Sequence, residues 1–185
     1  MKCFPAALLA ALTALPAAAD GYWEYRDWRV FSETAGTGED LRRTCTAVTG
    51  GDGLPSLRLS ITNGDAGPPH AYPQPALHES APRGHGTLVQ DGMAVAFVFD
   101  RQAAFYGIAE GWHDDQGFAR AEARPRGQDA LDMLRWMKAG QSLDIRLMHP
   151  YQEGREVMAA SLNGFTAAYG KMMDECGFSL ELPAE

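Results

Sequence analysis

The three cysteines, Cys3, Cys45 and Cys176, place the strongest constraint on how this 185-residue chain can fold. Cys3 lies in an N-terminal segment with the pattern of a secretory signal peptide. That segment has a positive charge at its start, an apolar stretch over residues 4–15, and small residues at positions 17 and 19. We expect residues 1–19 to be cleaved off, which leaves one pair of cysteines.

This remaining pair predicts a single disulfide. Export would place Cys45 and Cys176 in an oxidising compartment, the periplasm or the exterior, where disulfides persist; two buried free thiols are the alternative. The bridge would close a loop of about 131 residues and stabilise the fold by roughly 5 kcal/mol. The apolar stretch of the leader is shorter than the roughly 20 residues that cross a bilayer, so a cleaved leader is favoured over an anchor. No transmembrane segment is expected after it.

The charge balance bounds the kinds of partner. Acidic residues number 24 and basic residues 16, which gives a formal net charge of −8. A chain of this sign is a poor match for the phosphates of nucleic acids or for anionic lipid. We therefore expect no nucleic-acid partner. The length predicts one domain over residues 20–185.

Short stretches of alternating apolar and polar residues predict a mainly β fold. The clearest alternation runs from Leu57 to Thr62. A continuous apolar run at residues 93–99, rich in Val and Phe, predicts a central strand. Further strands are predicted at residues 22–31 (one strand or a strand pair), 44–48, 103–109, 117–123, 143–148 and 156–162.

Two helices are predicted in the second half of the chain. The first covers residues 130–139, with Asp129 as its N-cap and Gly140 at its end. The second covers residues 165–176, with Asn163 as its cap and Gly177 as its end. Together these elements predict an immunoglobulin-like β-sandwich of short antiparallel strands with two helices, the second at the C-terminus.

Residues 65–86 are rich in Pro, Gly and His and show no apolar period, which predicts a long surface loop. His70, His78 and His85 lie in it, and imidazole nitrogens are common ligands of Zn and Cu. Their spacings of about eight and seven residues lack the close pairing of known metal sites. Solvated loop residues are therefore favoured over a periplasmic metal-binding module, and no cofactor is expected.

No residue pattern predicts catalysis. The chain lacks the Gly-x-Ser-x-Gly pattern of a serine hydrolase, and no spacing selects a pair of carboxylates for acid/base chemistry. A small secreted carbohydrate-binding or hydrolytic sandwich is a further alternative. It would use Trp23, Trp28 or Trp112 as a stacking platform.

Several segments together resemble the invasion-associated locus B family of secreted bacterial proteins. The likeness includes Trp28-Arg29-Val30, Cys45 and the strand at residues 93–100. Its most specific part is Ser161-Leu162-Asn163-Gly164-Phe165, which precedes the helix that carries Cys176.

The resemblance implies an envelope-associated or periplasmic β-sandwich, with no established catalytic residues to carry over. Together with the leader and the paired cysteines, it predicts an exported, non-enzymatic protein. Such a protein would act through surface contacts with an envelope or host-surface protein.

Overall fold

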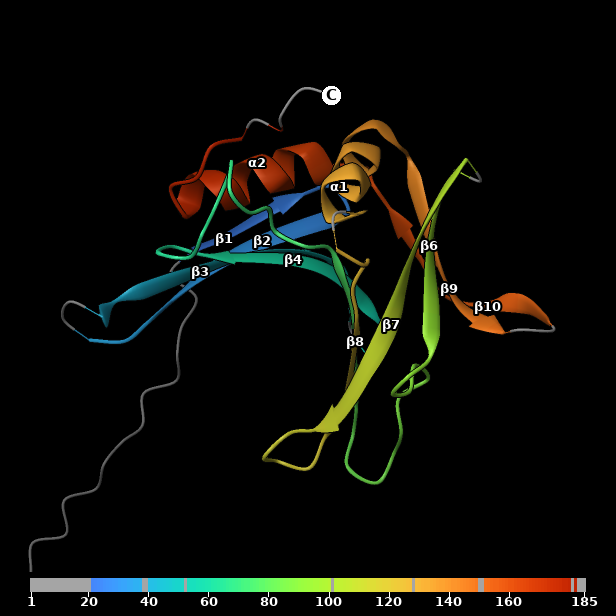
Figure 1. Cartoon of the computed structure of the whole chain (residues 1–185). Coiled ribbons are helices and arrows are strands. Elements are labelled where there is room, and N and C mark those ends of the chain that lie inside the picture. The colour runs from blue at the N-terminus through green and yellow to red at the C-terminus, as the bar shows by residue number, and fades with distance from the viewer. Residues whose placement is uncertain are drawn as a thin grey trace, which may run out of the picture.

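The described part of the chain is mainly β, with ten antiparallel strands in one sheet and two helices, the second in the C-terminal part of the chain (Figure 1). This confirms the predicted fold class. The computed structural model describes residues 21–37, 40–51, 53–100, 102–127, 129–149, 152–180 and 182, and the predicted signal peptide lies outside them. The strand order is β1-β2-β3-β4-β5-β8-β7-β6-β9-β10. The elements are β1 (Gly21–Tyr25), β2 (Trp28–Ala35), β3 (Arg42–Gly50), β4 (Ser56–Thr62), β5 (Ala76–Ala81), β6 (Ala94–Phe99), β7 (Ala103–His113), β8 (Ala119–Ala123), α1 (Asp129–Ala139), β9 (Ser142–His149), β10 (Gln152–Ser161) and α2 (Phe165–Glu175).

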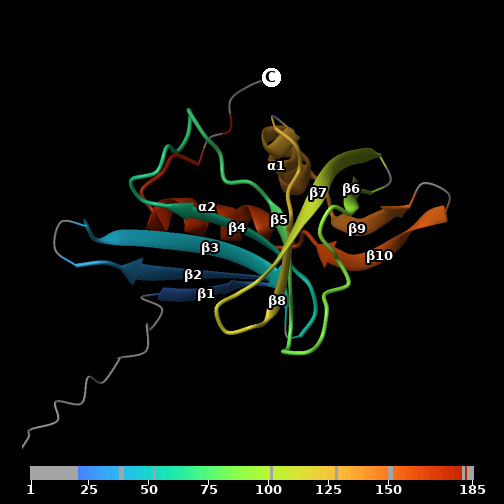
Figure 2. The same cartoon turned by 60° about the horizontal axis from the view of Figure 1, so that its bottom comes forward.

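The long strand β7 is shared between two groups of strands. Residues 103–108 pair with β6, and residues 109–113 pair with β8. Figure 2 shows the two groups on either side of β7. The far ends of the sheet meet where the indole Nε1 of Trp28, on β2, donates a hydrogen bond of 3.0 Å to the carbonyl oxygen of Ser161, on β10. The sheet therefore curls so that β2 and β10 come into contact, and this curvature gives it a sandwich-like shape.

The alternation of apolar and polar residues at 57–62 predicts a strand, and strand β4 covers this segment. Leu57, Leu59 and Ile61 are buried on the face of the sheet that holds the core. On the opposite face, the hydroxyl groups of Ser60 and Thr46, from the neighbouring strand β3, are 2.9 Å apart and hydrogen-bonded. One face is thus apolar and the other polar, as period-two patterning requires.

One prediction is wrong: residues 65–86 are not a continuous surface loop, because strand β5 occupies part of them. Glu79 on β5 is buried, and its carboxylate accepts hydrogen bonds from the backbone N–H groups of Leu88 (2.8 Å) and Val89 (2.9 Å). A buried carboxylate interrupts the apolar alternation by which a strand is recognised from sequence. The other predicted strands are present, and residues 22–31 belong to a strand pair, β1 and β2.

Helix α2 packs across β1 to β4, with α1 beside it (Figure 1). The predicted end of α2 is confirmed, since the N–H groups of Gly177 and Phe178 donate to the carbonyl groups of Asp174 and Met173. The predicted stripes are buried: Ala130, Met133, Leu134 and Met137 in α1, and Phe165, Ala168, Tyr169, Met172, Met173 and Cys176 in or just after α2.

The predicted cap of α2 is wrong. The N-cap is Gly164, in a left-handed conformation with φ of 95°, and it makes no side-chain capping hydrogen bond. Asn163 instead directs its backbone carbonyl towards the turn between β1 and β2, where it accepts a hydrogen bond from the N–H of Asp27 (3.4 Å). The start of α2 is therefore held by a backbone hydrogen bond to the β1–β2 turn, and not by a capping hydrogen bond from the Asn163 side chain.

The Ser161–Phe165 stretch holds the start of α2 against the β1–β2 turn. Ser161 Oγ donates to Asp27 Oδ2 (2.7 Å), and the rings of Phe165 and Trp28 lie 4.9 Å apart between centroids. A Cβ atom on Gly164 would lie 2.0 Å from the carbonyl oxygen of Tyr25. A glycine is needed at this position for both its backbone conformation and its close approach to the turn.

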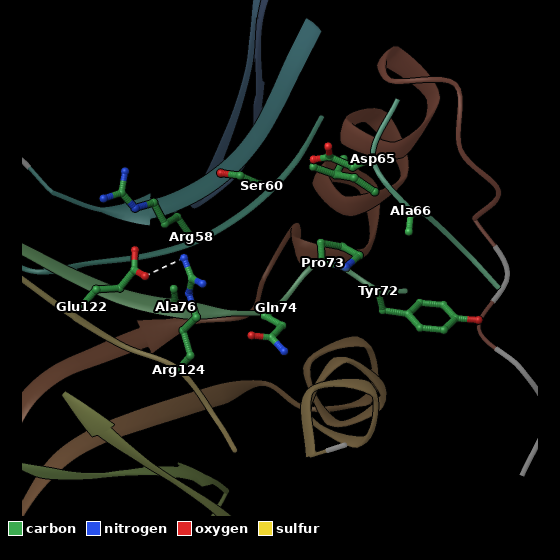
Figure 3. Close-up of a pocket in the computed structure, with 11 residues that line it drawn as sticks. Arg58, Ser60, Asp65, Ala66, Tyr72, Pro73, Gln74, Ala76, Glu122 and Arg124 are labelled. Carbon is green, nitrogen blue, oxygen red and sulfur yellow. Dashed lines mark ion pairs between the residues drawn. The ribbon is translucent and has the colours of Figure 1, made fainter. Parts of the chain in front are cut away.

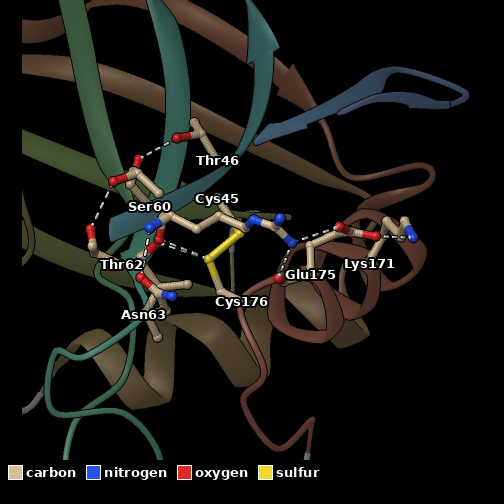
Figure 4. Close-up of a disulfide and its surroundings, with 11 residues drawn as sticks. Cys45, Thr46, Ser60, Thr62, Asn63, Lys171, Glu175 and Cys176 are labelled. Carbon is tan, nitrogen blue, oxygen red and sulfur yellow. Dashed lines mark hydrogen bonds and ion pairs between the residues drawn. A yellow bond between two sulfur atoms is a disulfide. The ribbon is translucent and has the colours of Figure 1, made fainter. Parts of the chain in front are cut away.

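The predicted disulfide joins Cys45, on β3, to Cys176, just beyond the end of α2 (Figure 4). The two Cα atoms are 6.0 Å apart, and both residues are buried. The alternative of two free thiols is therefore wrong. Next to the bridge, Glu175 forms ion pairs with Arg43 and Lys171. The disulfide fixes the end of α2 to the sheet, as Trp28 and Gly164 fix its start.

Replacement of both cysteines by alanine should lower the free energy of unfolding by roughly 5 kcal/mol, because the unfolded chain regains the freedom of a 131-residue loop. Urea unfolding of the oxidised wild type and the double variant measures this. The reduced wild type is the control and should resemble the variant. Equal stability of all three proteins would contradict the role of the bridge.

Gly164→Ala should lower the free energy of unfolding by roughly 2–5 kcal/mol, because the new Cβ combines a strained φ with a steric clash. The matched control is Gly64→Ala, at a φ of 90° with no heavy atom within 4 Å of the added Cβ. The control should lose only about 1 kcal/mol. Equal losses in urea unfolding would show that Tyr25 does not constrain position 164.

Candidate functional site

A hollow on the surface opens where strands β4 and β5 separate. The two strands pair only over Ser56–Arg58 and Ala76–His78, so the second half of β4 has no partner from β5. A pocket of about 440 Å³ fills the gap (Figure 3). Its wall comes from β4, β8 and residues 65–76, and it is lined by Arg58, Ser60, Ile61, Asp65, Ala66, Tyr72, Pro73, Gln74, Ala76, Glu122 and Arg124.

The outer wall of the pocket is held against the region that follows α2. Gly67 is buried, and a Cβ atom there would lie 2.0 Å from the ring of Phe178. The carbonyl oxygen of Gly67 also accepts hydrogen bonds from the N–H groups of His70 (2.9 Å) and Ala71 (3.1 Å). The segment that leads to Tyr72 is therefore shaped by its own turn and by the core beneath it.

Three charged side chains gather at one end of the pocket. In Figure 3, Arg58, Glu122 and Arg124 lie at the same end of the pocket, and a dashed line joins Glu122 to Arg124. Arg124 Nη2 is 2.6 Å from Glu122 Oε1, so these two residues form an ion pair. A second carboxylate of the lining, on Asp65, faces Arg42 at 3.8 Å. Both carboxylates of the pocket thus have a basic partner.

Arg58 stands apart from these pairs. None of the ion pairs or side-chain hydrogen bonds found among the described residues involves its guanidinium. Burial lowers the pKa of Arg58, Glu122 opposes that shift, and the positive charges of Arg120 and Arg124 add to it. Arg58 is therefore a half-buried cation without a direct ion pair among the described residues, and the carboxylate that attracts it, Glu122, is itself bonded to Arg124.

Arg120, by contrast, donates hydrogen bonds from all three nitrogen atoms of its guanidinium group. Its Nε and Nη2 donate to Asp114 Oδ2 at 3.0 and 2.8 Å, and its Nη1 donates to Ser80 Oγ at 2.8 Å. The hydrogen bond from Arg120 is the main cause that lowers the pKa of Asp114, followed by the N–H of Phe118. Arg120 thus has a structural role in the turn between β7 and β8.

A second surface feature lies along β7. Tyr106, Ile108 and Trp112 occupy alternate positions of this strand and are 52%, 42% and 44% exposed. We call these three residues the β7 strip. Trp112 also borders a shallow hollow with Asp91 and Arg120. Large apolar side chains that share one face of a strand are typical of contact surfaces.

The structure does not bring the three predicted histidines together. His78 lies on β5 opposite Ser56 and Glu122, His70 borders a hollow beside α1, and His85 is exposed after β5. Among the described residues there is no group of three or more His, Cys, Asp or Glu side chains that could hold a metal ion. The histidine set is therefore not a preformed site.

The three tryptophans of the predicted carbohydrate-stacking platform differ in exposure. Trp28 is fully buried, so its assignment as a platform is wrong. Trp23 is half-buried, and Lys171 Nζ lies 4.3 Å from the centre of its ring. Trp112 has an exposed ring. No helix in the described part of the chain is long and apolar enough to cross a membrane.

Comparison with known proteins gives one solved structure to report. The crystal structure of invasion associated protein B from Bartonella henselae is 13% identical to this chain, with a TM-score of 0.47; the alignment covers 84% of this chain and 98% of that one. No protein-family model matches the chain. No curated protein matches it either. A likeness of this size does not establish the family, so membership in the invasion-associated locus B family stays a prediction.

Arg58→Met should leave the free energy of unfolding unchanged or raise it, because the variant removes a half-buried charge that makes no direct ion pair or side-chain hydrogen bond with the described residues. Arg120→Met is the matched control and should lower it by about 1–2 kcal/mol, because Asp114 and Ser80 lose their donor. Urea unfolding of both variants tests the contrast. A larger loss for Arg58→Met than for Arg120→Met would make Arg58 a structural residue.

Proposed function

We propose that this chain is an exported, non-enzymatic protein of the bacterial envelope or periplasm, of the invasion-associated locus B type, that acts through contacts with another protein. The observation that carries the proposal is the β7 strip. Tyr106, Ile108 and Trp112 expose large apolar side chains along a strand that is central to the sheet. Aromatic residues on a rigid element are typical anchors of protein interfaces.

The position of the strip favours a protein partner. Residues 103–108 of β7 pair with β6 and residues 109–113 pair with β8, so β7 lies inside the strand order of the sheet and is not one of its two end strands. A partner would therefore contact the side chains of the strip rather than add a strand to an edge. Glu110, which lies between Ile108 and Trp112, would give the contact a polar component.

The disulfide supports export. The bridge between Cys45 and Cys176 lies in the core and joins distant parts of the chain. Stable bridges of this kind are typical of proteins that fold in oxidising compartments. The leader-like pattern of residues 1–19 agrees with that location.

The test uses the full chain, produced in a Gram-negative bacterium with a photo-crosslinking amino acid at position 106. The control carries the same amino acid at Thr166, an exposed position of α2. After irradiation of intact cells, the periplasmic fraction should contain the processed chain. We expect a protein adduct of defined mass from position 106 and none from position 166.

The further substitution Ile108→Ser should reduce the yield of the adduct, because it removes an adjacent apolar contact. Two outcomes would contradict the proposal. The first is an unprocessed chain that stays in the cytoplasm. The second is an exported chain that gives no adduct from position 106, or gives the same adducts from both positions.

A further inference from the structure

We propose that the pocket between β4, β8 and residues 65–76 binds a small sugar acid, that is, a monosaccharide-sized molecule with one carboxylate or phosphate group. Arg58 would receive the oxyanion. This site is separate from the β7 strip and goes beyond the proposed function. The charges of the pocket, its shape at Ala76 and the mixture of groups in its wall all suit such a ligand.

The charges of the pocket leave room for one anionic group. Arg58 has no ion pair within the described chain, whereas Arg124 is paired with Glu122, and Asp65 faces Arg42. Two basic and two acidic residues line the pocket, and Arg42, which lies outside the pocket, faces Asp65 at 3.8 Å. Arg58 is therefore the one basic residue of the described lining that has no direct ion pair, which suits a ligand with one anionic group better than a polyanion.

Arg124 offers a second donor. Its side chain is 56% exposed, whereas that of its partner Glu122 is 22% exposed. A guanidinium group carries five N–H donors in a planar fork, so Arg124 can keep its bond to Glu122 and donate to a ligand from its other nitrogen atoms. Arg58 and Arg124 together would bind an oxyanion from two sides.

A small residue separates the two arginines. Arg58 is directly opposite Ala76 on β5, and Ala76 precedes Leu77, which pairs with Ala123 on β8. Ala76 therefore lies between the strand positions of Arg58 and Arg124 and presents only a methyl group on that face of the sheet. A larger side chain at this position would occupy the space that an oxyanion needs.

The rest of the wall suits the body of a sugar. Ser60 and Gln74 supply a hydroxyl and an amide group and lie on opposite sides of the opening in the view of Figure 3. Tyr72 supplies an aromatic ring at the end away from the arginines. Hydroxyl-rich ligands are held by such polar groups together with an aromatic face. The volume of about 440 Å³ is within the range of small-molecule sites.

Isothermal titration of the folded, oxidised protein tests the proposal with three probes: glucose 6-phosphate, glucuronate and neutral glucose. We expect at least one of the two acids to bind and glucose to bind more weakly by about tenfold or more. Binding of the phosphate alone, of the carboxylate alone, or of both supports the proposal and identifies the oxyanion. The affinity should fall as NaCl is raised, because the attraction is electrostatic.

Two variants remove the site in different ways. Arg58→Gln removes the charge, and Ala76→Leu fills the space but keeps every charge; each should weaken binding by about tenfold or more. The control Arg155→Gln changes an exposed arginine on β10 and should leave binding unchanged. Circular dichroism confirms that each variant is folded.

Binding of neither acid, equal binding of glucose and the acids, or binding that survives both Arg58→Gln and Ala76→Leu would overturn the proposal. None of these results depends on the crosslinking from position 106, so failure of the pocket and failure of the β7 strip are distinguishable.

Discussion

The rest of the structure depends on the attachment of helix α2 to the sheet at both of its ends. At its start, Gly164 packs against the carbonyl oxygen of Tyr25, and Phe165 packs against the buried ring of Trp28. At its end, the disulfide joins Cys176 to Cys45 on β3. Between these two points the apolar stripe of the helix covers β1 to β4. The core is rich in methionine and alanine, whose side chains are flexible or small, so fixed ends define the position of the helix more than side-chain shape does.

This attachment also determines the shape of the candidate site. Immediately after Cys176 the chain turns at Gly177 and places Phe178 over Gly67. Gly67 begins the turn that leads to Tyr72 and Gln74 in the wall of the pocket. The consecutive residues Cys176, Gly177 and Phe178 thus connect the disulfide to the wall of the pocket around Gly67, which is more than 100 residues earlier in the chain than Cys176. Strand β4 supplies the other side of the same pocket with Arg58 and Ser60, and its buried residues contribute to the core under α2.

Much of the fold could be predicted from the sequence, because its strands and helices have regular patterns. The sequence shows strand β4 and both helices through the periodic spacing of their apolar residues. It shows the disulfide because only two cysteines follow residue 19. Strand β5 was missed because Glu79 is buried at a position that normally carries an apolar residue, and its partners, Leu88 and Val89, are supplied by the following loop. The cap at Asn163 was wrong because a tertiary contact with Asp27 replaced the local one.

The candidate site was not predictable in the same way, since Arg58 has the ordinary appearance of a polar residue on the outer side of a strand. Its role depends on the gap between β4 and β5 and on the pairing of Glu122 with Arg124, both of which arise from tertiary structure. The attached end of α2 positions the wall of the pocket. Hydrogen exchange of the oxidised wild type and of the folded Cys45→Ala/Cys176→Ala variant measures the effect of this attachment on the wall. We predict faster exchange in the variant at residues 65–74 and 174–178, with β6 and β9 unchanged. A uniform increase, or an increase that spares residues 65–74, would show that the attachment of α2 does not position the wall.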